Sequence, residues 1–75
     1  MSFQVFVRVC SGRTIALEVE HGDPISMIKQ RIQDREGIPP RYQRVLYNGH
    51  QLSDETPLGA AGISPAATLH CLLRI

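Results

Sequence analysis

The segment Thr68-Leu69-His70-Cys71-Leu72-Leu73-Arg74-Ile75 lies at the end of the sequence, and its side chains alternate in character. In an extended strand, successive side chains point to opposite faces of the sheet. One face is uniformly apolar and predicts core positions for Leu69, Cys71 and Leu73. The other face combines a leucine with an imidazole and a guanidinium, in Thr68, His70, Leu72 and Arg74. This second face is typical of a surface that contacts another molecule.

Two further alternating runs lie near the start of the chain. Residues 3–9 place valines on one face, and residues 14–20 do the same with Ile15, Leu17 and Val19. A short loop with Ser11 and Gly12 separates the two runs. The pattern predicts a β-hairpin.

An amphipathic helix is expected next. Isoleucines recur there at spacings of three and four residues, as Ile25, Ile28 and Ile32. Asp23 is expected to cap the first turn, with Pro24 at the first helical position. Gly37 is expected to end the helix in a left-handed conformation. Lys29 lies beside the apolar stripe, so its aliphatic stem is expected to follow buried surface.

The second half of the chain predicts short strands joined by turns. Residues 43–47 form a strand, and Asn48-Gly49 is the strongest two-residue hairpin signal, leading into residues 50–52. Residues 53–67 are expected to be a loop anchored by Leu58 and Ile63, because prolines and glycines interrupt any long helix. The element order predicts a single α+β domain over residues 1–75, with a mixed sheet of four to five strands packed on one helix.

Composition argues against several functional classes. The 75 residues carry a formal net charge of +1, so no attraction to nucleic acid is expected, and no apolar run is long enough to span a membrane. Cys10 and Cys71 are expected to stay unpaired, which suits the cytoplasm or nucleus. His21, His50 and His70 have no carboxylate or cysteine at triad or ligand spacing. Neither an enzyme, a metal site nor a cofactor is therefore expected.

Several motifs together resemble one known family. The most specific is Glu36-Gly37-Ile38-Pro39-Pro40 with Ile32-Gln33-Asp34 upstream, and Gln4-Val5-Phe6-Val7 and Thr68-Leu69-His70 accompany it. From Gln4 to Ile75, the chain is similar to ubiquitin without a gap. The resemblance implies the β-grasp (ubiquitin-like) fold, which has the element order predicted above.

The resemblance also implies a docking surface. Ubiquitin's apolar patch on the sheet face corresponds here to Cys10, Leu46, His70 and Leu72. Cys10 is smaller than the family's leucine, so its contribution is expected to be weaker. A polar rim is expected around this centre, formed by Arg44, His50, Gln51 and Arg74. The implied partners are ubiquitin-binding domains, proteasome subunits and enzymes of the ubiquitin pathway.

Two departures from the family argue against conjugation. The family's modifiers end in a diglycine, whereas the given sequence matches through Arg74 and Ile75 without one. Ubiquitin's chain-building lysines correspond to residues without a reactive amine, namely Arg8, Arg13, Arg31, Arg35, His50 and Pro65. Lys29 is the only lysine, and it is the remaining candidate conjugation acceptor.

Three functions are compatible with these observations. The first is a non-conjugated ubiquitin-like domain of a larger protein that docks through the patch. The second is a ubiquitin-like modifier whose diglycine follows Ile75, favoured by Arg74, which matches an arginine that ubiquitin's activating enzyme recognises. The third is an intramolecular regulatory domain of an enzyme. The isolated domain is expected to be a monomer, without nucleic-acid or membrane partners.

Overall fold

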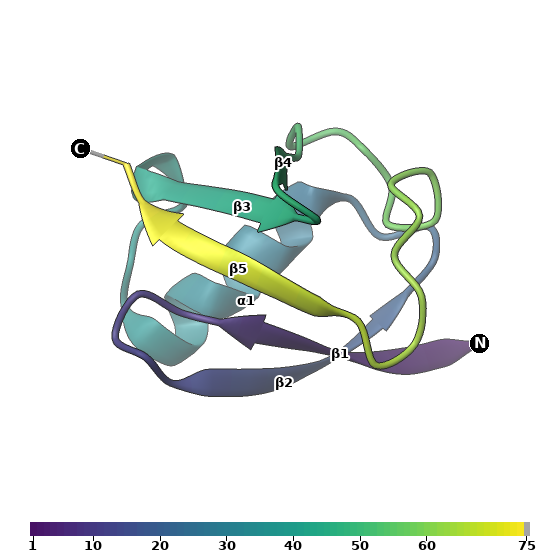
Figure 1. Cartoon of the computed structure of the whole chain (residues 1–75), viewed down its shortest axis with the longest axis horizontal. Coiled ribbons are helices and arrows are strands. Elements are labelled where there is room, and N and C mark those ends of the chain that lie inside the picture. The colour runs from purple at the N-terminus through teal and green to yellow at the C-terminus, as the bar shows by residue number, and fades with distance from the viewer. Residues whose placement is uncertain (75) are drawn as a thin grey trace.

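A computed structural model describes residues 1–74 of the chain. Its five strands form one mixed sheet, and a helix crosses one face of that sheet (Figure 1). The elements are β1 (Ser2–Arg8), β2 (Thr14–Glu20), α1 (Ile25–Glu36), the 3-10 helix η1 (Pro40–Tyr42), β3 (Gln43–Tyr47), β4 (His50–Gln51) and β5 (Thr68–Leu73). The arrangement confirms the predicted β-grasp fold.

Strand β5 occupies the centre of the sheet, whose order is β2-β1-β5-β3-β4. It runs parallel to β1, where Arg8 pairs with His70. It runs antiparallel to β3, where Leu46 pairs with the same His70. Strands β1 and β2 form the predicted antiparallel hairpin. The last strand in the sequence is therefore held on both sides by earlier strands.

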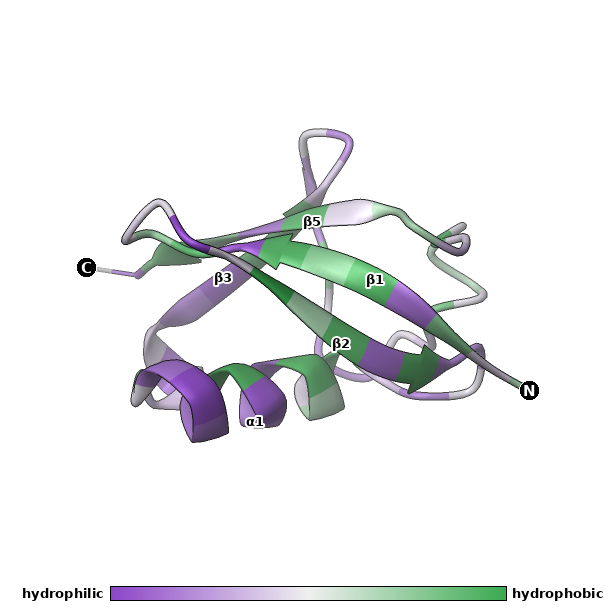
Figure 2. Cartoon of the chain, turned by 90° about the horizontal axis from the view of Figure 1, so that it is seen from below, coloured by the Kyte–Doolittle hydropathy of each residue, from purple (hydrophilic) through white to green (hydrophobic). Residues whose placement is uncertain are grey.

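The core lies between the sheet and α1, which Figure 2 shows packed across one face of the strands. Alternate residues of the long strands are buried there, together with the predicted helix stripe and the two loop anchors. The buried apolar residues are Val5, Val7, Val9, Ile15, Leu17, Val19, Ile25, Ile28, Ile32, Val45, Leu58, Ile63, Leu69 and Cys71. Because fully burying an aliphatic side chain stabilises a fold by roughly 1.5–3 kcal/mol, this cluster is the main source of stability.

The core position predicted for Leu73 is wrong. Its side chain is 49% exposed, whereas Leu69 and Cys71 on the same side of β5 are buried. Leu73 is the last residue of the strand, and it pairs with Gln43. The buried Gln43 amide fills the inner side at this end of the sheet, where it donates to one carbonyl of α1 at 2.9 Å and one of the following loop at 2.8 Å. Leu73 therefore lies beyond the edge of the hydrophobic core.

Two glycine-containing turns match their predictions. Gly37 ends α1 with φ 77°, and its N–H donates to the Gln33 carbonyl at 2.8 Å. Asn48 and Gly49 join β3 to β4 with φ angles of 52° and 79°. Positive φ at both central residues is the requirement of a two-residue hairpin turn, and glycine meets it without a steric cost.

The cap predicted at the start of α1 is wrong. The Asp23 carboxylate accepts a hydrogen bond from the Glu20 N–H at 2.8 Å, so it closes the turn after β2 instead. Pro24 occupies the N-cap position, one residue before the predicted place, and no side chain caps the helix there.

Backbone carbonyls of a later loop replace that cap. The Ile25 N–H donates to the Thr56 carbonyl at 3.1 Å, and the Ser26 N–H donates to the Asp54 carbonyl at 2.9 Å. These donors belong to the first turn, whose N–H groups have no partner within the helix. The loop between β4 and β5 is therefore fastened to the start of α1.

Among residues 1–74, the structure contains no helix with the length and apolar character required to cross a bilayer.

Candidate protein-binding face

Three patch residues predicted from the sequence lie together on the sheet face opposite α1. Leu46 of β3 pairs directly with His70 of β5, so their side chains are cross-strand neighbours. Leu72 follows His70 by two residues and shares its face. His70 is exposed, Leu72 is 45% exposed and Leu46 is half-buried. We call this surface, formed by Leu46, His70 and Leu72, the outer patch.

The outer patch continues across the sheet in a single cross-strand row. Gln51 of β4 pairs with Leu46, and Arg8 of β1 pairs with His70. The row therefore runs Gln51, Leu46, His70, Arg8, with an apolar and an imidazole group between two polar ends. Gln51 is one of the rim residues predicted from the sequence, whereas Arg8 is not.

Arg44 is the second polar neighbour of the patch. It pairs with Leu72 across β3 and β5, and its Nε donates to Gln51 Oε1 at 3.1 Å. The hydrogen bond holds both side chains beside the leucines. Arg74 follows β5 and is exposed, and its backbone N–H donates to the Tyr42 carbonyl at 2.6 Å.

The structure does not bring His50 to this rim. His50 pairs with Tyr47, which packs against the core, whereas the next pair is Leu46 with Gln51. Adjacent pairs of a ladder alternate between faces, so His50 lies on the other side from Leu46. The predicted Asn48-Gly49 turn gives this same pairing, so the adjacent residues His50 and Gln51 point to opposite faces and only Gln51 borders Leu46.

Cys10 lies at the edge of the region. Pairing between β1 and β5 ends at Arg8, and Cys10 follows in the exposed turn before β2. Figure 1 shows this turn at the same end of the sheet as the last residues of β5. Its membership of the binding surface stays a prediction.

The charge around the outer patch has one sign. The outward-facing residues of β1, β3, β4 and β5 include Arg8 and Arg44 and, within residues 1–74, no carboxylate. The acidic residues lie instead on β2, on α1 and in the adjoining loops, as Glu18, Glu20, Asp23, Asp34, Glu36, Asp54 and Glu55. An apolar centre with a cationic border is therefore available to a partner.

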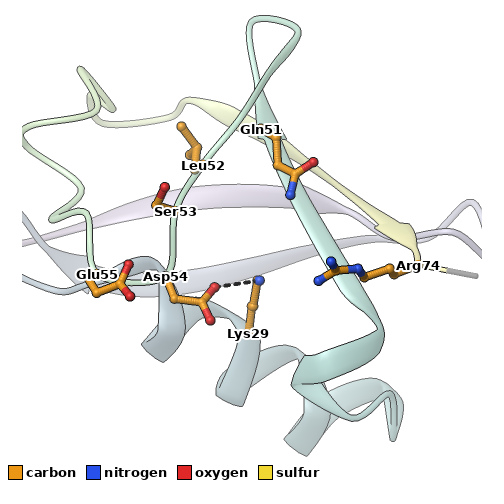
Figure 3. A pocket seen from close by; sticks show the side chains of 7 residues that line it. All are labelled: Lys29, Gln51, Leu52, Ser53, Asp54, Glu55 and Arg74. Atoms are coloured by element: carbon orange, nitrogen blue, oxygen red, sulfur yellow. Dashed lines mark hydrogen bonds and ion pairs between the residues drawn. The ribbon is translucent and has the colours of Figure 1, made fainter.

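A second, polar region lies beside β4. A hollow of about 370 Å³ opens there, lined by Lys29, Gln51, Leu52, Ser53, Asp54, Glu55 and Arg74 (Figure 3). Lys29 Nζ lies 2.6 Å from Asp54 Oδ1, and the Lys29 side chain is only 10% exposed. The predicted course of its stem along buried surface is confirmed.

Both cysteines are free thiols, as predicted. The pKa of Cys71 is raised from 9.0 to about 11, mainly by burial and to a smaller extent by the charge of Cys10, while Lys29 acts in the opposite direction. The Cys71 thiol contacts Gln43 Oε1 at 3.7 Å on the inner side of the sheet. Near neutral pH this thiol is protonated and is not a nucleophile.

In the described part of the chain, residues 1–74, no three His, Cys, Asp or Glu side chains are grouped so as to hold a metal ion.

The sequence profile described as the Ubiquitin family matches residues 5–75. This chain belongs to the ubiquitin family. The β-grasp sheet agrees with this match to almost the whole chain.

Individual members of the ubiquitin family differ in how much of their length this chain matches. Ubiquitin-like protein NEDD8 of Dictyostelium discoideum is 33% identical over 69 residues, which cover 92% of this chain and 90% of that protein. NEDD8-like protein RUB3 of Arabidopsis thaliana is 35% identical over 72 residues, covering 96% and 92%. Ubiquitin-like protein 4A of Esox lucius is 34% identical over 68 residues, covering 91% of this chain but only 44% of that protein. Similar domains thus occur both as nearly a whole protein and as part of a longer one.

Proposed function

We propose that this ubiquitin-family chain is a non-conjugated interaction domain of a larger protein. It docks ubiquitin receptors, proteasome subunits or ubiquitin-pathway enzymes through the outer patch. The observation that supports this most is Leu72, an aliphatic side chain 45% exposed on the central strand beside Leu46 and His70. Apolar side chains gathered on a rigid face inside a polar border are typical of a binding site. The match to under half of Ubiquitin-like protein 4A supports a place within a longer chain.

The border of the patch favours a particular partner chemistry. Arg8 and Arg44 flank the leucines, and the seven carboxylates of the chain lie elsewhere. A helix or loop that presents aliphatic side chains to the centre and carboxylates to the border would complement both features. The apolar area is small, so dissociation constants on the order of micromolar or weaker are expected.

A matched pair of leucines tests the proposal. Leu72 and Leu73 are adjacent, have similar exposures of 45% and 49%, and point to opposite sides of β5. The ¹⁵N-labelled domain is titrated with a ubiquitin-interacting helix while the amides of Leu46 and His70 are followed by NMR. Leu72→Ala is expected to weaken binding about tenfold, as loss of a central interface residue does, whereas Leu73→Ala leaves it nearly unchanged.

Comparing the two variants distinguishes specific binding at the outer patch from nonspecific binding to any exposed leucine. Equal losses in the two variants would mean that the helix does not select the outer side of β5. Binding unaffected by Leu72→Ala would remove the patch from the proposal. Thermal melts of both variants serve as the control for folding.

A second candidate function is that of a protein modifier. The NEDD8-like relatives support it, because this chain covers about nine-tenths of their length. Arg74 supports it as well, since the guanidinium lies exposed beyond β5, where a partner can reach its forked charge.

Thioester formation distinguishes the modifier from the interaction domain. The chain is extended beyond Ile75 with a tail that ends in diglycine and is incubated with a ubiquitin-family activating enzyme and ATP. A modifier is expected to form a thioester that Arg74→Ala reduces strongly. Absence of any thioester, with normal binding through the outer patch, supports the interaction domain.

A cytoplasmic or nuclear location is proposed alongside either function. The free thiols of Cys10 and Cys71 support a reducing compartment. Fluorescence microscopy of the tagged full-length protein in its own cells tests this location.

A further inference from the structure

We infer that the folded domain is closed to lysine-directed acylation, because Asp54 holds its only lysine, Lys29, in an ion pair within the polar hollow. The domain can then dock on acyl-transfer enzymes without being acylated on a lysine side chain. This inference goes beyond the proposed docking function. It rests on the hollow beside β4 rather than on the outer patch.

The first observation is the distribution of basic residues. Seven of the eight lysine-plus-arginine positions are arginine, and Lys29 is the remaining one. A guanidinium keeps the positive charge of the surface but stays protonated and does not attack acyl groups. Side-chain amine chemistry on this domain therefore depends entirely on the state of Lys29.

The second observation is that Lys29 is fixed at both ends. Its backbone carbonyl accepts a hydrogen bond from the buried Gln43 amide at 2.9 Å. Its ammonium donates to Asp54 Oδ1 at 2.6 Å, and only 10% of the side chain is exposed. Figure 3 shows the stem rising from α1 toward the Asp54 carboxylate. The Lys29 amine thus contacts a carboxylate instead of projecting into open solvent.

The third observation concerns the carboxylate itself. Asp54 is 55% exposed and lies on the solvent side of the pair. Its loop is not free, because the Asp54 carbonyl accepts from the Ser26 N–H and the neighbouring Thr56 carbonyl accepts from the Ile25 N–H. Two backbone hydrogen bonds to the start of α1 therefore keep the carboxylate over the amine.

The chemistry of acyl transfer makes this arrangement protective. In aminolysis of a thioester, the lone pair of a neutral amine attacks the carbonyl carbon. The new C–N bond forms, the C–S bond breaks, the thiolate leaves, and the nitrogen loses a proton. An ammonium bound to a carboxylate has no lone pair to offer, and a donor must also displace Asp54 to reach it. Reaction at Lys29 thus requires the pair to open.

Amine-selective acylation of the intact chain tests the inference. The folded chain is treated with an N-hydroxysuccinimide acetate at neutral pH, quenched over time, digested and analysed by mass spectrometry, which separates Lys29 from the terminal amine. Arg35→Lys supplies the matched control, because Arg35 is exposed in the last turn of the same helix. The introduced amine at position 35 is expected to react at least about tenfold faster than Lys29, as groups that react only through local opening are slowed.

Asp54→Asn, which keeps the size of the side chain, is expected to raise the Lys29 rate severalfold, while NMR spectra confirm that the sheet persists. Equal rates at positions 29 and 35 in the Arg35→Lys variant would overturn the inference, as would an Asp54→Asn variant whose Lys29 stays equally slow. Binding through the outer patch is measured on the same variants. If binding is intact while Lys29 reacts freely, the inference about Lys29 fails and the proposed function stands. If Lys29 is protected while binding through the outer patch is absent, the proposed function fails and the inference about Lys29 stands.

Discussion

The two faces of β5 differ in what their side chains do. The inner face buries Leu69 and Cys71 completely against the helix side of the sheet. The outer face leaves His70 exposed and Leu72 45% exposed. One strand therefore supplies part of the core on one side and most of the outer patch on the other. Under the proposed function, stability and binding would be separable residue by residue along this single strand.

The largest expected effect is on stability, at the inner face. Leu69→Ala is expected to lower the free energy of unfolding by about 2–5 kcal/mol, because it removes buried methyl groups and leaves a cavity. Leu72→Ala, on the outer face, is expected to change it by less than about 0.5 kcal/mol. Urea denaturation of both variants measures the difference. Similar losses of unfolding free energy in the two variants would contradict the assignment of Leu69 to the core and Leu72 to the surface.

The next effect is a loss of stability at high pH. Because the pKa of Cys71 rises from 9.0 in its ordinary state to about 11 in the fold, the folded chain holds the thiol proton more tightly. The contribution of this proton to stability is complete below pH 9 and is lost as the pH rises through 9 to 11. The total loss is about 3 kcal/mol, because the shift spans two pKa units at about 1.4 kcal/mol each.

Alkaline denaturation series compare the wild type with Cys71→Ala, whose stability should fall less steeply over this range. Cys10→Ala, which removes the exposed thiol, is the control and should retain most of the wild-type slope. An unchanged slope in Cys71→Ala would mean that the buried thiol does not govern this dependence.

A smaller effect on both binding and stability is expected for Leu46, which lies between the core and the solvent. Leu46 is half-buried in the outer patch and pairs with His70. Leu46→Ala is expected to weaken binding of an acidic, amphipathic helix about tenfold, with a stability loss of about 1 kcal/mol. Isothermal titration calorimetry and thermal melts give the two numbers. A loss of stability without a loss of affinity would assign Leu46 to the core alone.

The smallest effect is electrostatic. Arg8→Gln removes a border charge opposite His70 and is expected to reduce affinity by less than about 1 kcal/mol. The same substitution should flatten the dependence of affinity on salt concentration. Arg35→Gln, on the exposed side of α1, is the control of equal charge change. If both variants behave alike, the border of the patch has no particular role.

Local sequence patterns predicted most of the fold. The alternation in residues 3–9 and 14–20, the isoleucine stripe of α1 and the Asn48-Gly49 turn depend on neighbouring residues only. The inner and outer sides of Leu69 and Leu72 follow from the same alternation. The resemblance to ubiquitin added Leu46, which lies on another strand and has no local signal linking it to His70.

The failures share a physical cause, which is contact between distant segments. Asp23 has a side chain typical of a helix cap, but the N–H groups of the first helical turn donate to carbonyls of a later loop instead. Leu73 follows the strand alternation, yet the buried Gln43 ends the core beside it. Arg8 depends on the parallel pairing of β1 with β5. None of these three contacts has a signature within a short window of sequence. His50 is the exception, because its pairing with Tyr47 follows from the local Asn48-Gly49 turn and directs it away from Leu46.

The carbonyls of Asp54 and Thr56 that complete the first turn of α1 also link the start of the helix to a loop far along the chain. Helix nucleation is unfavourable in isolation, and this turn gains its partners only when a segment far along the chain has arrived. We therefore expect the amides of Ile25 and Ser26 to exchange with solvent at one common free energy of opening, measurable by native-state hydrogen exchange. The start of the helix, the loop and the Lys29–Asp54 pair would then fold and open as one unit.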